Sequence, residues 1–235
     1  MKLLAVETAT EACSAALLID GEIQERWQLA PRIHTKLILP MIDSLMAEAG
    51  LTLTQLDALA FGCGPGSFTG IRIATGVIQG LAFGADLPVA PVSTLAAIAQ
   101  DFFNNNPESI AFTAMDARME EIFWGVYQRN NEGYAQLLGE EAVTPAEQVT
   151  FPDVQGVGLG SGWAAYPQVL DARLGLRVQC RVANDVWPKA AAIALLGGYY
   201  YQQGLAVPVE QAMPVYLRDK VAKPKLKGRK FNWLV

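Results

Sequence analysis

Gly62-Cys63-Gly64-Pro65-Gly66-Ser67-Phe68-Thr69-Gly70 is a glycine-rich turn that joins a predicted strand, residues 58–61, to a predicted helix, residues 70–84. Glycine tolerates positive φ and lets another backbone or a ligand come close. The amides at the start of a helix can bind an anion. No lysine follows a glycine here and the spacing is G-x-G-x-x-x-G, so the turn is neither a P-loop nor a dinucleotide-binding fingerprint. Two interpretations stay open: contact with a phosphate or nucleotide, or a purely structural tight turn.

The elements around this turn follow a regular order. Asp20-Gly21 is a hairpin signal between two strands, Gly50 ends the first helix and Ser93 starts the third. The predicted elements are strands at residues 2–7, 12–19 and 22–28, a helix at 34–49, a strand at 58–61, a helix at 70–84, a strand at 88–92 and a helix from 93 to about 103. This βββαβαβα order is the repeating unit of the two-domain α/β fold of actin-like ATPases (ASKHA, RNase H-like).

A second, reduced copy of the unit is predicted after Asn104-Asn105-Asn106-Pro107, which marks a domain boundary. Its predicted elements are strands at 109–115, 122–128, 134–138 and 154–158, one helical turn at 145–149, and helices at 163–173 and 187–203. We therefore expect a first domain at residues 1–104, a degenerate second domain at 105–219 and a basic tail at 220–235. For the helix at 187–203, packing back on the first domain is an alternative to packing within the second.

The composition restricts the function classes. The chain has 235 residues, 51% of them hydrophobic, which is enough for two small domains with real cores. The net charge of -5 gives no overall nucleic-acid footprint. Three cysteines without metal-type spacing indicate a reducing compartment. Apolar runs too short for a signal peptide or a membrane span predict a soluble, cytoplasmic protein. The single histidine, His34, is expected to cap a helix or lie on the surface.

The first predicted helix carries more apolar surface than one sheet face requires. Two apolar stripes run along it, one of them through Leu37, Met41 and Leu45. A helix on a single sheet needs a stripe of roughly 100°. The surplus is either core beneath a loop or a surface for a partner.

Glycines recur at four-residue spacing on the second helix, at Gly76, Gly80 and Gly84. Each interior glycine costs about 1 kcal/mol relative to alanine, so a row of three indicates the close approach of another element. That element is either the helix's own sheet or a helix across a subunit interface. The candidate interface comprises Leu37, Met41, Leu45, Ile73, Gly76, Val77, Gly80, Leu81 and Gly84.

A nucleotide site would combine the glycine-rich turn with the end of the first strand. The likeness to actin-like ATPases implies an aspartate there beside a glycine-hydroxyl turn. This chain instead reads Glu7-Thr8-Ala9-Thr10, with a carboxylate but no glycine, so we expect a weak or vestigial site at most. The candidate residues are Glu7, Thr8, Gly64, Gly66, Ser67, Thr69 and Gly160.

Two charged segments have two interpretations each. The segment Asp116–Glu121 places carboxylates together, which suits acid-base chemistry, and a surface or interface turn is the alternative. The end of the chain is basic, and Phe231 and Trp233 there are able to stack on bases. It is either a solvated tail or a contact to a phosphate backbone. The candidate contact residues are Lys223, Lys225, Lys227, Arg229 and Lys230.

Several segments resemble the TsaB (YeaZ) family. The most specific is Gly64-Pro65-Gly66-Ser67-Phe68-Thr69-Gly70-Ile71-Arg72-Ile73, and residues 4–10, 116–123 and 214–218 are also similar. The resemblance implies a two-domain actin-like fold and a non-catalytic scaffold or activator. It implies a heterodimer with the catalytic paralogue TsaD, which transfers threonylcarbamoyl to the tRNA adenosine 3′ of the anticodon. It further implies association with the P-loop ATPase TsaE, contact with tRNA through the complex, and a homodimer when the partner is absent.

The resemblance also bears on metals and cofactors. TsaD carries N-H-x-x-x-H on its third helix, where two histidines four residues apart bind a metal. The matching positions here are Thr94 and Ile98, so we expect no metal, no cofactor and no catalysis by the chain alone. The alternative is a small actin-like kinase or ATPase acting alone, which requires a usable aspartate and ATP turnover. A peptidase is not expected, because His34 is the one histidine available as a base.

Overall fold

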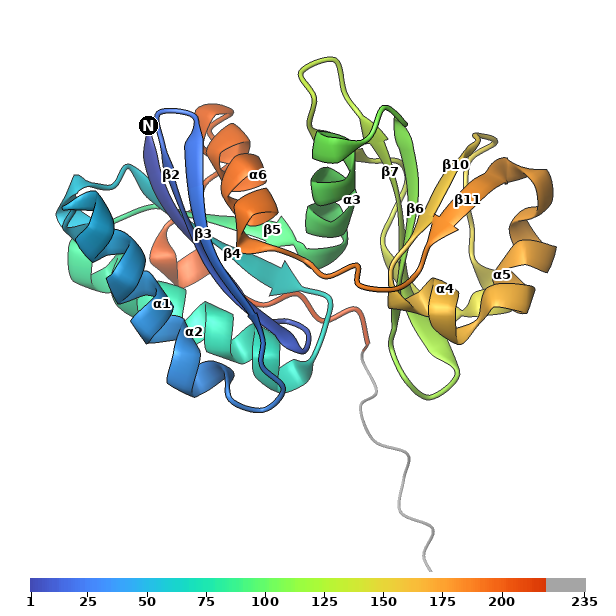
Figure 1. Cartoon of the computed structure of the whole chain (residues 1–235), viewed down its shortest axis with the longest axis horizontal. Coiled ribbons are helices and arrows are strands. Elements are labelled where there is room, and N and C mark those ends of the chain that lie inside the picture. Colours follow the sequence, from blue (N-terminus) through green and yellow to red (C-terminus); the bar gives the residue numbers. More distant parts are fainter. Residues whose placement is uncertain (219–235) are drawn as a thin grey trace, which may run out of the picture.

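The computed structural model describes residues 1–218. Two β-sheets stand side by side, each with helices on its outer face, and two further helices lie between them (Figure 1). The strands are β1 Lys2–Glu7, β2 Ala12–Ile19, β3 Glu22–Leu29, β4 Ala58–Gly64, β5 Val89–Ser93, β6 Ile110–Asp116, β7 Glu121–Arg129, β8 Ala135–Leu137, β9 Ala142–Pro145, β10 Gly156–Leu159 and β11 Val178–Val182. The α-helices are α1 His34–Ala49, α2 Phe68–Ala85, α3 Thr94–Asn105, α4 Ser161–Ala165, α5 Pro167–Leu174 and α6 Ala190–Gln202.

The first sheet has the strand order β3-β2-β1-β4-β5. β1 pairs antiparallel with β2 and parallel with β4. α1 packs on β2 and α2 on β4, while α6 covers β1, β2 and β4. The central strands are buried on both faces and therefore consist almost entirely of apolar residues, as burial on both faces requires.

The second sheet repeats this plan in shortened form. Its order is β11-β10-β6-β7-β8, with β9 also paired to β7. α4 packs on β6 and β10, and α5 packs on α4, so these two short helices cover the outer face. Trp124 and Trp163 fill the core between them and the sheet, with ring centroids 6.3 Å apart. The two sheets with their outer helices give the actin-like architecture that the element order predicts.

α3 and α6 form the layer between the sheets (Figure 1). α3 packs on β6, β7 and β8 as well as on α6, and one continuous apolar cluster extends from Leu3 in the first sheet to Leu159 in the second. Gly197 lets α6 lie close to the first sheet, because a Cβ there would come within 2.5 Å of the Ala60 Cβ. The helix predicted at 187–203 thus packs on the first sheet.

Most predicted elements are confirmed within two or three residues at each end. The helix predicted at 163–173 is wrong as a single element: it divides into α4 and α5 at Tyr166, because Pro167 starts a new helix. β9 and β11 were not predicted. β9 has only four residues, and β11 is a five-residue edge strand whose alternation of apolar and polar residues was overlooked. None of the helices within residues 1–218 is long and apolar enough to cross a bilayer.

Candidate functional site

The outward surface of α1 and α2 mixes half-buried apolar side chains with exposed glycines. On α2, half-buried Ile73, Val77 and Leu81 run beside a row of exposed glycines, and Leu37 and Met41 of α1 are half-buried as well. All five apolar side chains pack at the margin of the core beneath the two helices. We call this surface the α1–α2 face. It comprises Leu37, Met41, Ile73, Gly76, Val77, Gly80, Leu81 and Gly84.

The glycine row on α2 opens outward. A Cβ built on Gly76, Gly80 or Gly84 would meet no atom within 4 Å. These glycines therefore do not let α2 approach its own sheet, which was one of the two interpretations of the row. Each still lowers helix stability by about 1 kcal/mol relative to alanine. Within residues 1–218, no contact made by the row offsets that cost.

Leu45 does not belong to this face. Its side chain is fully buried with Ile38, Ile42 and Met46 against the first sheet, so its assignment to the interface is wrong. Leu45 was grouped with Met41 because the two are four residues apart. In the structure α1 lies along the first sheet with Leu45 facing that sheet. Three large apolar residues of these helices are exposed but were not predicted as interface residues, Leu39, Phe68 and Phe83, whose exposed fractions are 48%, 46% and 79%.

The glycine-rich turn is filled by the chain itself. A Cβ on Gly66 would lie 2.6 Å from the Ala9 carbonyl oxygen, and one on Gly70 would lie 2.1 Å from that of Thr8. The Thr8 hydroxyl donates to the Gly70 carbonyl at 2.7 Å. These glycines are explained by close backbone packing of the turn against the end of β1.

Two amides at the start of α2 already have acceptors. The Ser67 amide donates to the Ala9 carbonyl at 2.7 Å, and the Ser67 side chain caps α2 by accepting from the Gly70 amide. Gly64 has a φ of 114° and lies against the Val215 carbonyl oxygen. The structural interpretation of the turn accounts for these contacts without a bound anion. Thr69 is exposed beside the turn.

The remaining nucleotide candidate lies on the other sheet. Gly160 follows β10 with a φ of 100°, and a Cβ there would lie 2.5 Å from the Ala114 carbonyl oxygen. The structure therefore brings Glu7, Thr8, Gly66 and Ser67 together, but Gly160 packs against β6. Its glycine too is explained by contact with a neighbouring strand.

Glu7 is the most perturbed acid in this region. Its side chain is fully buried at the end of β1. The Ala9 amide donates to Oε1, whereas Oε2 has no hydrogen-bond partner within the described residues and lies under Gly62. Burial raises the pKa of the carboxyl to about 7, although the amides of Ala9 and Thr8 act in the opposite direction. A group so enclosed has no open route to a metal-bound phosphate.

The charged segment between β6 and β7 is a tight surface turn. Arg118, Met119 and Glu120 all have φ near 60°, a conformation that L-residues adopt reluctantly. Arg218 fastens the turn by donating to the Glu121 carboxylate and to the Ala117 carbonyl oxygen. Glu121 is thus engaged in an ion pair, which favours the surface-turn interpretation over acid-base chemistry.

His34 and the basic tail complete the predicted sites. His34 is 8% exposed and Ile33 occupies the N-cap of α1, so the expectation of a capping or surface histidine is wrong. The third-helix positions Thr94 and Ile98 are buried in the core. The predicted tRNA contacts Lys223, Lys225, Lys227, Arg229 and Lys230 lie outside the described residues.

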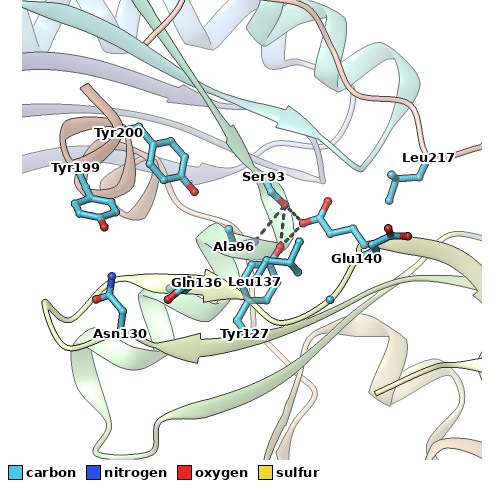
Figure 2. A pocket seen from close by; sticks show the side chains of 13 residues that line it. Ser93, Ala96, Tyr127, Asn130, Gln136, Leu137, Glu140, Tyr199, Tyr200 and Leu217 are labelled. Atoms are coloured by element: carbon cyan, nitrogen blue, oxygen red, sulfur yellow. Dashed lines mark hydrogen bonds between the residues drawn. The ribbon is translucent and has the colours of Figure 1, made fainter. Parts of the chain in front are cut away.

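A pocket between the two sheets was not predicted. It has a volume of about 590 Å³ and receives residues from α3, β7, the segment after β8, and α6 (Figure 2). Glu141 lies there, hydrogen-bonded to the hydroxyls of Ser93 and Tyr127. Ser93 and Glu141, which are hydrogen-bonded in the pocket, are 48 positions apart in the sequence, so no local motif could have indicated the pocket.

Known proteins resemble this chain over most of its length. The family model described as "TsaD: tRNA N6-adenosine threonylcarbamoyltransferase" matches residues 28–226. The "tRNA threonylcarbamoyladenosine biosynthesis protein TsaB" of Escherichia coli K12 is 43% identical, over 97% of this chain and 100% of its own. The protein of the same description from Haemophilus influenzae is 40% identical, over 97% and 98% of the two chains.

A solved structure has the same fold. The one described as "YeaZ from Pseudomonas aeruginosa" superimposes with a TM-score of 0.84 and is 42% identical. The match covers 92% of this chain and 99% of the other. Both the sequence and the three-dimensional arrangement are thus shared with these proteins over nearly their whole length.

Proposed function

Because this chain belongs to the TsaB (YeaZ) family of tRNA threonylcarbamoyladenosine biosynthesis proteins, we propose that it is a non-catalytic subunit of a tRNA threonylcarbamoyltransferase. It acts in the cytoplasm by forming a heterodimer with a TsaD-like catalytic paralogue through the α1–α2 face. The transfer itself, to the tRNA adenosine 3′ of the anticodon, takes place on that paralogue.

The observation that carries this proposal is the open glycine row. Three interior glycines without an intramolecular neighbour are costly for an isolated helix. They become favourable where the backbone of another helix packs against them, because a side chain would hold the two helices apart. The half-buried side chains Met41 and Val77 supply apolar area beside the row.

The partner's fold makes the pairing geometrically natural. The TsaD family model covers residues 28–226 of this chain, so a TsaD-like protein contains counterparts of α1 and α2. Two such helix pairs can meet about a pseudo-twofold axis and form a four-helix bundle. The same self-complementary surface supports a homodimer when the partner is absent. We propose that the heterodimer also provides the binding surface for a TsaE-like P-loop ATPase.

The non-catalytic role is supported by the residues at the positions that match the metal ligands of TsaD. Thr94 and Ile98 are buried in the core, and isoleucine offers no metal ligand. Glu7 is enclosed, and the glycine-rich turn packs on the chain itself. These features disfavour the alternative of a small kinase or ATPase acting alone.

Replacing Met41 with glutamate tests the proposal. The half-buried side chain lies on α1 within the α1–α2 face, so a charge there would be desolvated in the complex without a partner. We expect Met41→Glu to weaken binding to the TsaD-like paralogue by about tenfold, roughly 1.4 kcal/mol, in titrations of the purified proteins. Val169→Glu on α5 is the matched control, since Val169 is 37% exposed in the half of the fold that is built on the second sheet, which we call the second lobe. Equal binding by the two variants would place the interface elsewhere.

The basic tail has a separate prediction. Changing Lys223, Lys225, Lys227, Arg229 and Lys230 together to alanine is expected to lower the tRNA affinity of the assembled complex about tenfold and to flatten its salt dependence, because fewer counterions are released. The control changes Arg177 and Arg181, two cations of the second lobe that pair with acids. An unaltered salt slope in the tail variant would assign the tail no contact with tRNA.

A further inference from the structure

The pocket between the two sheets has the size and the lining of a ligand site. Its volume of about 590 Å³ falls within the range of small-molecule sites. Both halves of the fold contribute: Ser93 and Tyr200 come from the first half, and Tyr127 and Glu141 come from the second. No residue of the glycine-rich turn lines it, nor does Gly160, so it is separate from the residues that were candidates for a nucleotide site.

A carboxylate is held rigidly in this pocket. The Ser93 hydroxyl oxygen accepts from the Leu95 and Ala96 amides at the start of α3, at 3.1 and 3.3 Å, so its own proton is free to point to Glu141. Tyr127 also donates to Glu141, and both donors meet the same oxygen, Oε1. Oε2 takes part in neither of these bonds, and it is not among the buried side-chain atoms that lack a partner, so it faces the open part of the pocket. One carboxylate oxygen is therefore fixed, and the other is accessible to a donor that enters the pocket.

The charges of the lining residues favour a positively charged ligand over a negatively charged one. Glu140 adds a second carboxylate, and within residues 1–218 the lining contains no lysine, arginine or histidine. Burial raises the pKa of Glu141, which is the effect of an uncompensated acid in a poorly solvated place. An anionic ligand would face repulsion from both acids, whereas a cation would relieve the desolvation of Glu141.

Aromatic rings line the other end of the pocket. Tyr199 and Tyr200 come from α6, and Tyr199 stacks on Tyr134 with ring centroids 4.2 Å apart. Figure 2 shows the two tyrosines of α6 across the pocket from Glu140 and Leu217. Such rings attract an ammonium or guanidinium group and also pack against an apolar body. Carboxylates and tyrosines in one cavity are the combination that organic cations require.

We propose that this pocket binds an organic cation, an ammonium or guanidinium group on an aromatic or aliphatic body, with the charged group at Glu141 and the body against Tyr199 and Tyr200. The cation bridges the two halves of the fold, because Glu141 directly precedes β9 of the second sheet and both tyrosines are on α6, which covers the first. Its source is either a free small amine or a lysine of the C-terminal tail, in which Lys220 is the first lysine after Arg218.

Tyramine is the probe, and 4-ethylphenol, which lacks the amine, is the matched neutral compound. By calorimetry with the full chain, tyramine should bind at least tenfold more tightly than 4-ethylphenol. Glu141→Gln should remove that preference, and Glu147→Gln, which changes an exposed acid outside the pocket, should keep it. Leu137→Arg, at a 37% exposed lining position, provides a second variant that places a cation in the pocket and should abolish binding without changing Glu141.

The chain ending at Arg218 separates the two sources. Tighter tyramine binding by the shortened chain would show that the lysines of the tail compete for the pocket, and equal binding would show that the site takes a free cation. If neither the full chain nor the shortened chain binds tyramine more tightly than 4-ethylphenol, the proposal is overturned. Retention of the tyramine preference by both folded variants, Glu141→Gln and Leu137→Arg, would overturn it as well.

Discussion

Gly80→Leu is expected to weaken binding to the TsaD-like paralogue at least about a hundredfold, roughly 2.7 kcal/mol, while leaving the isolated chain as stable as before or more stable. A leucine Cβ at this position meets no atom of the folded chain within 4 Å. Leucine is also a better helix former than glycine by roughly 0.5–1 kcal/mol. The same side chain projects from the α1–α2 face into the space that a partner helix would occupy, so it separates the two backbones and removes the close packing between them.

Gln168→Leu is the matched control, because it places the same side chain at an exposed position of α5 in the second lobe. Urea unfolding gives the stability of each variant, and titration with the paralogue gives the affinity. A Gly80→Leu variant that binds with unchanged affinity would show that the glycine row is not in the interface. A variant that loses several kcal/mol of stability would show that the row packs within the chain after all.

Glu7→Gln is expected to stabilise the chain in a pH-dependent manner. The pKa of Glu7 is about 7 in the folded protein, against 4.5 for an exposed glutamate. The folded state therefore holds a proton that the unfolded state releases, and the stability of the parent falls as the pH rises from about 4.5 to about 7. Glutamine resembles the protonated acid and does not titrate. The variant should gain roughly 2–3 kcal/mol relative to the parent between pH 5 and pH 8.

Urea unfolding at the two pH values measures this gain. Glu11→Gln is the control, because Glu11 is exposed in the same part of the chain and its replacement should change the stability equally at both pH values. A Glu7→Gln difference that is the same at pH 5 and pH 8 would contradict a protonated, desolvated Glu7. It would indicate that the carboxyl has access to solvent or to a cation.

The architecture could be predicted from the sequence because its signals are local. Apolar runs in the strands, Gly50 after α1 and Ser93 before α3 each act within a few residues, and together they give the order of elements that identifies the fold. The same local reasoning failed at Pro167, where the break between α4 and α5 was overlooked. It also missed β11, a five-residue strand at the edge of the second sheet whose alternation of apolar and polar residues was overlooked.

The sites were harder to predict, because they depend on which side of an element faces outward. The four-residue glycine spacing on α2 was visible, but only the fold shows that the row points away from the sheet. Leu45 shared a stripe with Met41 and yet lies over the first sheet in the core. The pocket at Glu141 joins β5, β7 and α6, and no short segment contains that information.

The glycine-rich turn shows how one motif supports two interpretations. Its amides and glycines suit an anion as well as a neighbouring backbone. The packing of Gly66 and Gly70 on Ala9 and Thr8 accounts for the glycines structurally. The turn thereby fixes the start of α2, and with it the direction of the α1–α2 face.

Site-specific photocrosslinking tests the central proposal most directly. Phe83 is 79% exposed and lies three residues after Gly80 on α2, so a p-benzoylphenylalanine at this position lies at the edge of the α1–α2 face. Leu176, which is 94% exposed in the second lobe, provides the control position. When each labelled chain is irradiated with the TsaD-like paralogue, we expect a crosslink from position 83 and none from position 176. A crosslink from position 176 alone would contradict the assignment of the partner surface to α1 and α2.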